Sequence, residues 1–332
     1  MKSLLVVVSL VLFSSLIAQA QIDDLAAPLR PVNTYSIVAY DAVTGQFGAA
    51  VQSHYFRVAN VIWLEPKVGA VATQSLVDFS YGPLGLEMMR LGKSSQQALD
   101  GLLASDPQNE VRQVAMIDRN GEVATHTGSG CIAYAGHQQG RHYSVQANLM
   151  RNNTVPAAMA EAFEKTQGDL AERLMAALEA AEAEGGDIRG KQSAALVVVS
   201  GEPTGQSWKD RLFDIRVDDS PEPLVELRRL LNLSRAYDFM DLGDIQMAQK
   251  DLVGARAYYE IAAAYAPDNP EILFWHAVAL ATAKDPGTFD DALDIFARVF
   301  AADKSWRELI PRLVDAKLLP DNQETIKRIM AQ

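Results

Sequence analysis

The sequence predicts an α+β domain of two stacked sheets with helices on both outer faces, followed by a separate all-α domain. Strand and helix patterns alternate in blocks from Thr34 to about Val217. Several of these strands are apolar on both faces, as expected for sheets buried between two layers. Beyond Pro223 the strand patterns stop, and residues 224–332 carry helical patterns only. A single antiparallel sheet with helices on one side is the alternative for residues 34–220.

The elements expected in the first domain follow from periodicity and turn signals. Strands are expected at 35–40, 46–51, 58–64, 68–74, 111–118, 122–127, 142–149 and 193–200, and helices at 82–91, 95–104, 155–165 and 169–184. Asn120-Gly121 is a hairpin turn, and Ser94 or Ser95 is an N-cap. Gly185-Gly186 ends the last helix. The small residues of 48–50 and 69–72 would let another sheet approach closely.

Composition restricts the class of protein. The chain has 332 residues, of which 48% are apolar and 22% charged, a mixture typical of a globular protein and not of a disordered or collagenous one. Acidic residues outnumber basic ones by 42 to 30, giving a net charge of −12, which argues against a nucleic-acid partner. Cys131 is the only cysteine, so neither an intrachain disulfide nor a multi-cysteine zinc site can form.

Residues 1–20 read as a signal peptide. Lys2 precedes an apolar run, and Ala18-Gln-Ala20 fits the small-x-small rule for cleavage. The alternative, an N-terminal membrane anchor, is disfavoured because the run is short for a span of about 20 residues. Residues 21–33 then form a linker or pro-segment. We therefore expect an exported protein, periplasmic or extracellular, without a membrane span.

The helical tail, residues 224–332, contains one unit that fits the tetratricopeptide pattern and a second, looser unit. The positions that fit are Leu242-Gly243, Ala255, Tyr259, Ala262 and Pro267 in the first unit, and Ala277, Ala292 and Phe296 in the second. Relative to the standard length of the repeat, the second unit has about three extra residues around 285–288. Repeats of this kind present binding faces, so the tail is interpreted as a module that docks a protein partner or forms a homo-oligomer. A plain helical hairpin is the alternative.

Several motifs of the first domain resemble one family. They are Tyr35-Ser-Ile-Val-Ala-Tyr-Asp41, Ala50-Val-Gln-Ser-His-Tyr-Phe56, Val68-Gly-Ala-Val-Ala-Thr-Gln-Ser75, Tyr81-Gly-Pro-Leu-Gly-Leu86, Tyr143-Ser-Val-Gln-Ala-Asn148 and Gly185-Gly-Asp-Ile-Arg-Gly-Lys-Gln-Ser193. In this order they are similar to domain-of-unknown-function family 1028. The resemblance implies the fold of N-terminal-nucleophile hydrolases, a four-layer αββα sandwich, which agrees with the order of elements.

In hydrolases of that fold, the nucleophile is a residue that becomes N-terminal after a cleavage, and its own α-amino group acts as the base. Thr34 opens the first strand in a way similar to proteasome-type members, and Lys67 lies at about the distance of their lysine. The resemblance therefore implies Thr34 as nucleophile and Lys67 as its partner. The acidic residue that those enzymes carry after the second strand is absent. A cut between Asn33 and Thr34 is also required. Otherwise Thr34 is a β-branched residue that starts a strand.

Five polar residues form a candidate substrate-binding set: Gln52, Ser53 and His54 end one expected strand, Asn148 lies within another, and Asp187 leads into the last strand. Gln74, Ser75, Gln146, Arg189 and Gln192 stand at similar places. Amides and hydroxyls at one edge of a sheet can bind an amide-like ligand or stabilise an oxyanion. The alternative is that they satisfy buried backbone groups, and that Asp187 simply pairs with Arg189.

Metal and cofactor signals are weak. His126, Cys131, His137 and His142 cluster in the sequence without the spacing of a zinc motif. The sequence has no glycine-rich phosphate loop, no Gly-x-Ser-x-Gly and no His-Glu-x-x-His. We expect neither a metal nor a cofactor.

Two functions remain after these exclusions. The first is an exported amidohydrolase of N-terminal-nucleophile type, which acts on a C–N amide bond of a peptide, a cell-wall fragment or an acylated small molecule. The alternative is a non-catalytic secreted protein that binds a ligand and docks a partner through its tail. A metal-dependent hydrolase built on the histidines is a weaker third hypothesis.

Overall fold

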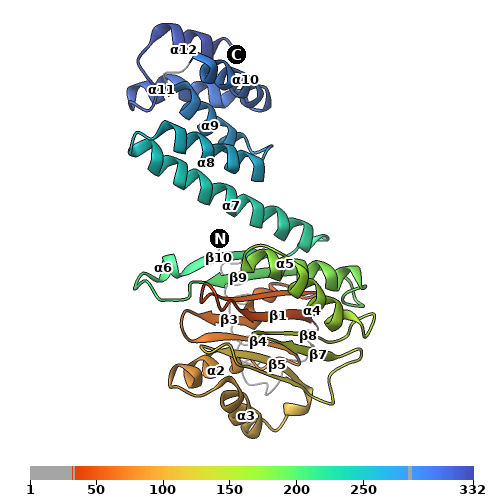
Figure 1. Cartoon of the computed structure of the whole chain (residues 1–332). Helices are drawn as coiled ribbons and strands as arrows, with labels where there is room; N and C mark the ends of the chain where they lie inside the picture. The colour runs from red at the N-terminus through yellow and green to blue at the C-terminus, as the bar shows by residue number, and fades with distance from the viewer. Residues whose placement is uncertain (1–31, 33, 283–285) are drawn as a thin grey trace, which may run out of the picture. The chain divides into compact units, whose positions relative to one another are not determined.

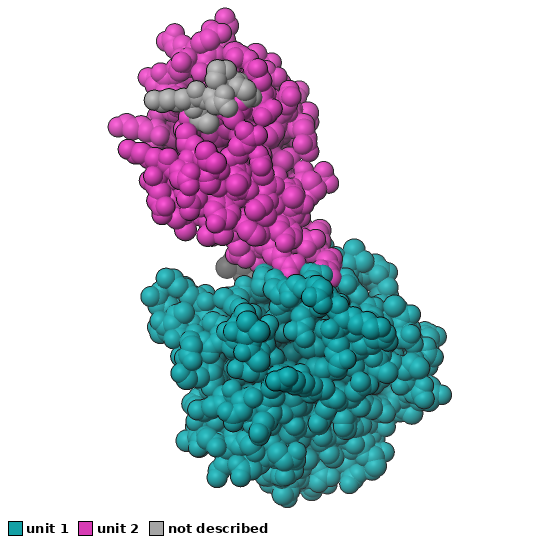
Figure 2. Space-filling model, in the orientation of Figure 1, with its two compact units in different colours: residues 1–227 teal, residues 228–332 magenta. Residues whose placement is uncertain are grey.

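The computed structural model describes residue 32, residues 34–282 and residues 286–332. The expected signal peptide and nearly all of the segment 21–33 lie outside the described residues. The chain divides between Leu227 and Arg228 into two compact units, which are described separately (Figure 2). In the described part of the chain, no helix is both long and apolar enough to cross a membrane.

Two antiparallel sheets form the first unit (Figure 1). Among the described residues, the larger sheet has the order β10-β9-β2-β1-β8-β7 and the smaller sheet the order β3-β4-β5-β6. Their strands are β1 (Thr34–Tyr40), β2 (Phe47–Ser53), β3 (Ile62–Glu65), β4 (Gly69–Ser75), β5 (Arg112–Asp118), β6 (Val123–Thr127), β7 (Gly136–Gly140), β8 (Tyr143–Ala147), β9 (Ser193–Val199) and β10 (Arg211–Val217). The two sheets that were predicted are confirmed and prove to be antiparallel, and the single-sheet alternative is wrong.

The sheets stack face to face, and helices cover their outer faces. Val38 of β1 and Ala72 of β4 belong to one buried apolar cluster between the sheets. Helices α4 (Val155–Lys165) and α5 (Leu170–Ala183) contact the larger sheet. The smaller sheet is covered by α2 (Tyr81–Arg90) and α3 (Ser95–Ser105). Shorter helical turns are η1 (Val58–Val61), η2 (Asn109–Val111) and α6 (Ser207–Asp210).

Local chemistry sets several of these boundaries as expected. Ser94 caps α3 in a reciprocal capping box with Gln97. Gly185 and Gly186, with φ of 103° and 53°, follow the end of α5. Gly121, with φ of 74°, completes the turn that joins β5 to β6.

Other expectations were wrong. Val58–Val61 forms a 3-10 turn, so β3 begins only at Ile62. Strands β7 and β10, the two edge strands of the larger sheet, were not expected. Strand β7 is polar, whereas in β10 Phe213, Ile215 and Val217 alternate with Asp214 and Arg216, a strand signal that was overlooked. Gly48 does not face the other sheet: a Cβ there would lie 2.5 Å from Leu174 Cδ1 of α5.

The second unit confirms the predicted helical C-terminal region. Its helices are α7 (Pro223–Ala248), which begins in the first unit, α8 (Leu252–Tyr265), α9 (Pro270–Thr282), α10 (Pro286–Ala302), η3 (Lys304–Glu308), α11 (Leu309–Asp315) and α12 (Gln323–Met330). The repeat-pattern positions Ala255, Tyr259, Ala262, Ala277, Ala292 and Phe296 are all buried. Helix α9 packs against both α8 and α10. Leu242, another position of the predicted pattern, is instead 38% exposed.

Gly48→Ala should destabilise the first unit, because the added methyl group would collide with Leu174 of α5. Overpacking of this kind costs about 1–3 kcal/mol in the free energy of unfolding, measurable by urea denaturation. Gly136→Ala in β7 is the matched control, since a Cβ there meets nothing within 4 Å. Equal stability of the two variants would contradict the packing described.

Candidate functional site

Most of the sequence-predicted site residues meet at one end of the larger sheet. Thr34 is paired with Ser53, and the backbone N–H of Asn148 donates to the Thr34 carbonyl at 3.1 Å. The N–H of His54, the residue after Ser53, donates to Asp187 Oδ2 at 3.3 Å. Strands β1, β2 and β9 thus bring together residues that are up to 153 positions apart in the sequence (Asp187 and Thr34). We call this region the Thr34 end.

Thr34 itself is fully buried. Its hydroxyl donates to the carbonyl of Val32 at 2.9 Å, and its own carbonyl accepts from Gln74 Nε2 at 3.0 Å. Gln74 belongs to β4 of the smaller sheet, so the contact crosses between the two sheets. The backbone of Thr34 is therefore fixed from both sheets, while its hydroxyl is engaged by the chain that precedes it.

Buried neutral side chains link the two sheets behind Thr34. We call Ser36, Gln74, Gln113, Gln146 and Asn148 the amide network, and each is fully buried. Gln113 Oε1 accepts from Gln74 Nε2 at 2.6 Å and from Asn148 Nδ2 at 2.9 Å. Ser36 donates to Gln74 Oε1 and accepts from Gln146 Nε2, both at 2.6 Å. The amide network supplies hydrogen-bond donors and acceptors without any formal charge.

Two amide side chains at this end retain unused hydrogen-bonding capacity. Asn148 Oδ1 and both polar atoms of Gln52 are buried and have no partner within the described residues. Gln52 lies on β2 opposite Tyr35, whose hydroxyl donates to Glu182 of α5 at 2.7 Å. Buried amides without a partner are costly, so these atoms could form further hydrogen bonds.

Asp187 has a structural role in this form. Its carboxylate is buried and accepts from Arg189 Nη2 at 2.7 Å as well as from the N–H groups of His54 and Arg189. The pair of Asp187 with Arg189 is the alternative that the sequence offered to a substrate-binding role for Asp187. The pair fixes the loop that leads into β9, beside the exposed side chain of His54.

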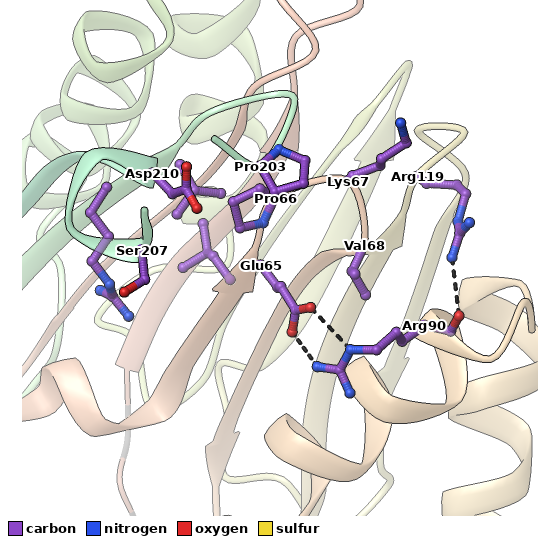
Figure 3. Close-up of a pocket in the computed structure, with 12 residues that line it drawn as sticks. Glu65, Pro66, Lys67, Val68, Arg90, Arg119, Pro203, Ser207 and Asp210 are labelled. Carbon is purple, nitrogen blue, oxygen red and sulfur yellow. Dashed lines mark hydrogen bonds and ion pairs between the residues drawn. The ribbon is translucent and has the colours of Figure 1, made fainter. Parts of the chain in front are cut away.

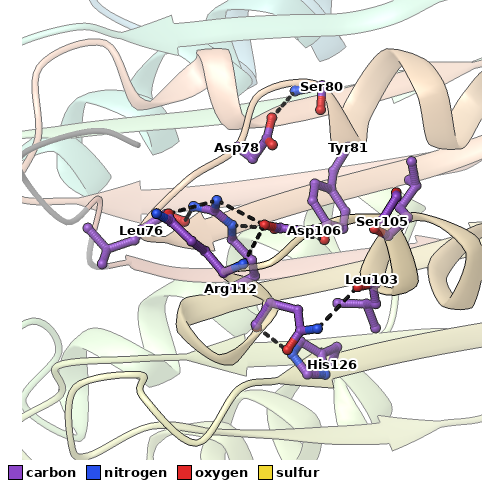
Figure 4. A network of polar contacts seen from close by, with 12 residues as sticks. Leu76, Asp78, Ser80, Tyr81, Leu103, Ser105, Asp106, Arg112 and His126 are labelled. Atoms are coloured by element: carbon purple, nitrogen blue, oxygen red, sulfur yellow. Dashed lines mark hydrogen bonds and ion pairs between the residues drawn. The ribbon is translucent and has the colours of Figure 1, made fainter. Parts of the chain in front are cut away.

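A buried ion pair supports the Thr34 end from the smaller sheet (Figure 4). Arg112 of β5, which is 1% exposed, donates to Asp106 Oδ2 at 2.7 Å and to the carbonyl of Leu76 at 2.6 Å. Leu76 follows Ser75, which is paired with Arg112 across β4 and β5. Burial alone would raise the pKa of Asp106, but hydrogen bonds from Arg112 and the backbone of Gln108 hold it below its usual range. Arg112 therefore anchors the end of β4.

Cys131 lies near this end but is poorly suited to be a nucleophile. Its Sγ donates to the carbonyl of Arg112 at 3.3 Å. Burial raises the pKa of the Cys131 thiol, which keeps it protonated.

The four residues of the weak metal pattern do not form a shared site. His126 Nε2 contacts the Asn109 carbonyl, whereas His142 Nδ1 contacts the Gly121 carbonyl at the other end of the sheet. His137 Nδ1 contacts the Thr127 hydroxyl at 2.8 Å. Across residues 32, 34–282 and 286–332, no three His, Cys, Asp or Glu side chains are grouped as metal ligands.

Lys67 is not near Thr34, so the predicted pairing does not fit the structure. Lys67 lies in the turn between β3 and β4, and its Nζ donates to Glu202 Oε2 at 2.6 Å. Strand β4 alone separates it from Gln74 and Thr34 by about 20 Å, at roughly 3.3 Å per residue. The number of residues between Thr34 and Lys67 was not enough to predict their contact. The turn places Lys67 at the start of β4, whereas Thr34 meets the end of this strand.

Lys67 instead lines an open pocket of about 530 Å³ (Figure 3). Three further basic residues, Arg90, Arg119 and Arg211, also line it, together with apolar residues such as Val68. Arg90 pairs with Glu65, and Arg119 Nη2 donates to the Met89 carbonyl at 3.0 Å. This basic pocket and the Thr34 end are separate features.

Residues 34–227 match the model of a family of unknown function, DUF1028. The chain belongs to the DUF1028 family. A solved structure of the same family, SPO2555 from Silicibacter pomeroyi, is similar with a TM-score of 0.55 and 29% sequence identity. The similarity covers 60% of this chain and 84% of that one. No curated protein matches the chain.

Sequence reasoning missed two residues on which this DUF1028 domain depends at the Thr34 end. Gln113 and Arg112 stand at the start of a strand, Arg112–Asp118, whose middle is apolar and in which every residue is buried. Polar residues inside such a strand were the available signal, because buried polar groups require partners. The sequence could not show that Gln113 would join both sheets.

Asp106→Ala should lower the free energy of unfolding at pH 7 by about 3–5 kcal/mol, because it leaves the buried Arg112 unpaired. The folded-state pKa of Asp106 is depressed, so the stability it contributes is present above its unfolded pKa, near 3.9, and is lost as pH falls through the folded value. The difference between wild type and variant in urea denaturation should therefore shrink below about pH 4.

Glu161→Ala is the control for this measurement. Glu161 forms an exposed pair with Lys165 within α4, and its removal should leave the urea midpoint unchanged. If Asp106→Ala also left the midpoint unchanged, Arg112 would not anchor β4.

Proposed function

We propose that this protein is an exported amidohydrolase whose nucleophile is Thr34 after a cut between Asn33 and Thr34. The observation that carries the proposal is the position of the Thr34 hydroxyl, held at the meeting point of two stacked sheets and 2.9 Å from a main-chain carbonyl. The layers, arranged as α4–α5, larger sheet, smaller sheet and α2–α3, support assignment to the αββα sandwich of N-terminal-nucleophile hydrolases.

The chemistry requires a free amine at Thr34. In the uncut chain the nitrogen of Thr34 belongs to a peptide bond and cannot accept a proton. After the cut, the α-amino group takes the hydroxyl proton while Oγ1 attacks the carbonyl carbon of the substrate amide. The C–N bond then breaks, the leaving amine takes the proton, and water hydrolyses the resulting ester. Val32 occupies this end of the uncut chain, which is therefore the inactive form.

The amide network supports the same proposal. Gln74 and Asn148 fix the Thr34 carbonyl, so the residue keeps its position when its upstream neighbour is removed. Asn148 Oδ1 is an unpartnered acceptor, and Asn148 Nδ2 lies 3.5 Å from the Thr34 carbonyl oxygen. A new α-amino group on Thr34 would supply the kind of donor that this atom lacks. Lys67 has no part in this proposal.

Thr34→Ala should abolish hydrolysis of N-acyl coumarin amides while costing only about 0.5–1.5 kcal/mol of stability, the contribution of one hydrogen bond. Thr34→Ser should retain partial activity because the attacking oxygen remains. Activity of the wild type should rise with pH as the α-amino group, with a pKa of about 7.7–8.0, loses its proton. Full activity of the alanine variant, with unchanged pH dependence, would exclude Thr34 as nucleophile.

The second candidate, a secreted ligand-binding protein, is favoured by the basic pocket. Its volume of about 530 Å³ suits a small molecule. Lys67, Arg90 and Arg211 are paired with carboxylates, so Arg119 is the lining cation that would favour an anion. In either case we propose that the tetratricopeptide-like tail docks a protein partner or a second copy of the chain.

Citrate and inorganic phosphate are suitable probes of the basic pocket. Arg119→Ala should weaken citrate binding about tenfold in calorimetry, because Arg119 is the lining cation for which no carboxylate partner is found among the described residues. Arg141→Ala, an exposed arginine outside the pocket, is the control. Absence of binding of either anion to the wild type would remove this candidate.

A further inference from the structure

Val32 adds one strand-like residue to the smaller sheet. Its N–H donates to the carbonyl of Ser75 at 2.6 Å, and the N–H of Ser75 donates back to the carbonyl of Val32 at 2.9 Å. The two residues thus form an isolated antiparallel bridge. Paired hydrogen bonds of this kind recognise an extended peptide backbone whatever its side chains are.

The side chain of Val32 is also bound. It is 1% exposed and belongs to the apolar cluster between the sheets, together with Val58, Val61 and Val77. A valine seated there removes its side chain from water as completely as a residue of the central strands. The position selects for an apolar side chain, since a charged one would be buried without a partner.

The other side of this contact belongs to the domain and not to the upstream segment. Ser75 has a φ of 71°, which turns the chain after β4. Arg112 holds the next carbonyl, that of Leu76, at 2.6 Å. The amide network fixes Gln74 on the other side. The backbone groups of Ser75 therefore stay in place when the segment before Thr34 is removed.

From this geometry we propose that the site occupied by Val32, which we call the Val32 slot, is the substrate subsite of the mature domain. It takes an extended peptide with an apolar, β-branched residue at the second position before the scissile bond. The assignment rests on the proposed function, because it takes Thr34 as the nucleophile. Val32 stands two residues before Thr34, and its carbonyl already lies 2.9 Å from Thr34 Oγ1.

Among the substrate classes compatible with amide hydrolysis, the Val32 slot favours a peptide. Both polar backbone groups of Val32 are used, so the slot recognises a peptide and not a simple acyl chain, which lacks the N–H donor. The upstream segment of the chain is then the first occupant of the slot, and it must leave before substrate enters.

Binding to the slot can be measured without catalysis. In the full chain, Val32→Asp should expel the upstream segment, because it would bury a carboxylate between the sheets. A fluorescein-labelled peptide Arg-Pro-Val-Asn, which copies residues 30–33, should bind this variant at least tenfold more tightly than it binds wild type. The peptide Arg-Pro-Asp-Asn should bind the same variant at least tenfold more weakly.

Circular dichroism should show that the variant is folded, and Val32→Ser serves as a milder replacement if it is not. Equal binding of the two peptides, or binding of neither to a folded variant, would overturn the slot.

Hydrolysis of the coumarin amides of both peptides by the mature protein separates the two proposals. Binding that is selective for valine, without hydrolysis, would support the Val32 slot and exclude Thr34 as the nucleophile. Hydrolysis without a preference for valine would support Thr34 as the nucleophile and exclude the Val32 slot as the substrate subsite.

Discussion

The structure of the first unit depends on satisfying the amide groups that are buried between its two sheets. Gln113 accepts hydrogen bonds from Gln74 and Asn148 and donates to the Thr127 hydroxyl and the Ala147 carbonyl. A one-residue shift in the register of β4 or β5 would turn Gln74 or Gln113 to the other face of its sheet and leave these amides unpaired in a dry interior. The same bonds that fix the stacking also fix Thr34, so fold and candidate site rest on one constraint.

The two ends of the stacked sheets differ in chemistry. The Thr34 end holds the neutral amide network, and its charged side chains Asp187 and Arg112 are paired with Arg189 and Asp106. The opposite end is open, and Lys67, Arg90, Arg119 and Arg211 line its pocket. A nucleophile that uses its own amine needs no neighbouring charge, whereas anion binding does. The separation therefore allows the two ends to serve different purposes.

Local signals in the sequence predicted much of this fold, and they failed where tertiary contacts decide. The Ser94 capping box, the glycines after α5 and the apolar central strands were all recognisable. Edge strand β10 was missed, although Phe213, Ile215 and Val217 alternate with Asp214 and Arg216 in the period of a strand. For the site, Thr34 and Asn148 were proposed separately, and the structure brings them together at one end of the larger sheet. The sequence separation between Thr34 and Lys67 wrongly suggested that the two residues pair. A count of residues does not show at which end of a strand a turn lies.

The intact mass of the protein exported from a bacterial host tests the central claim most directly. A nucleophile that works through its own α-amine must be the first residue of the active form. If Thr34 is the nucleophile, the mature chain begins at Thr34 in every preparation that hydrolyses amides. An active preparation whose chain begins at Gln21, with the segment before Thr34 still attached, would contradict it.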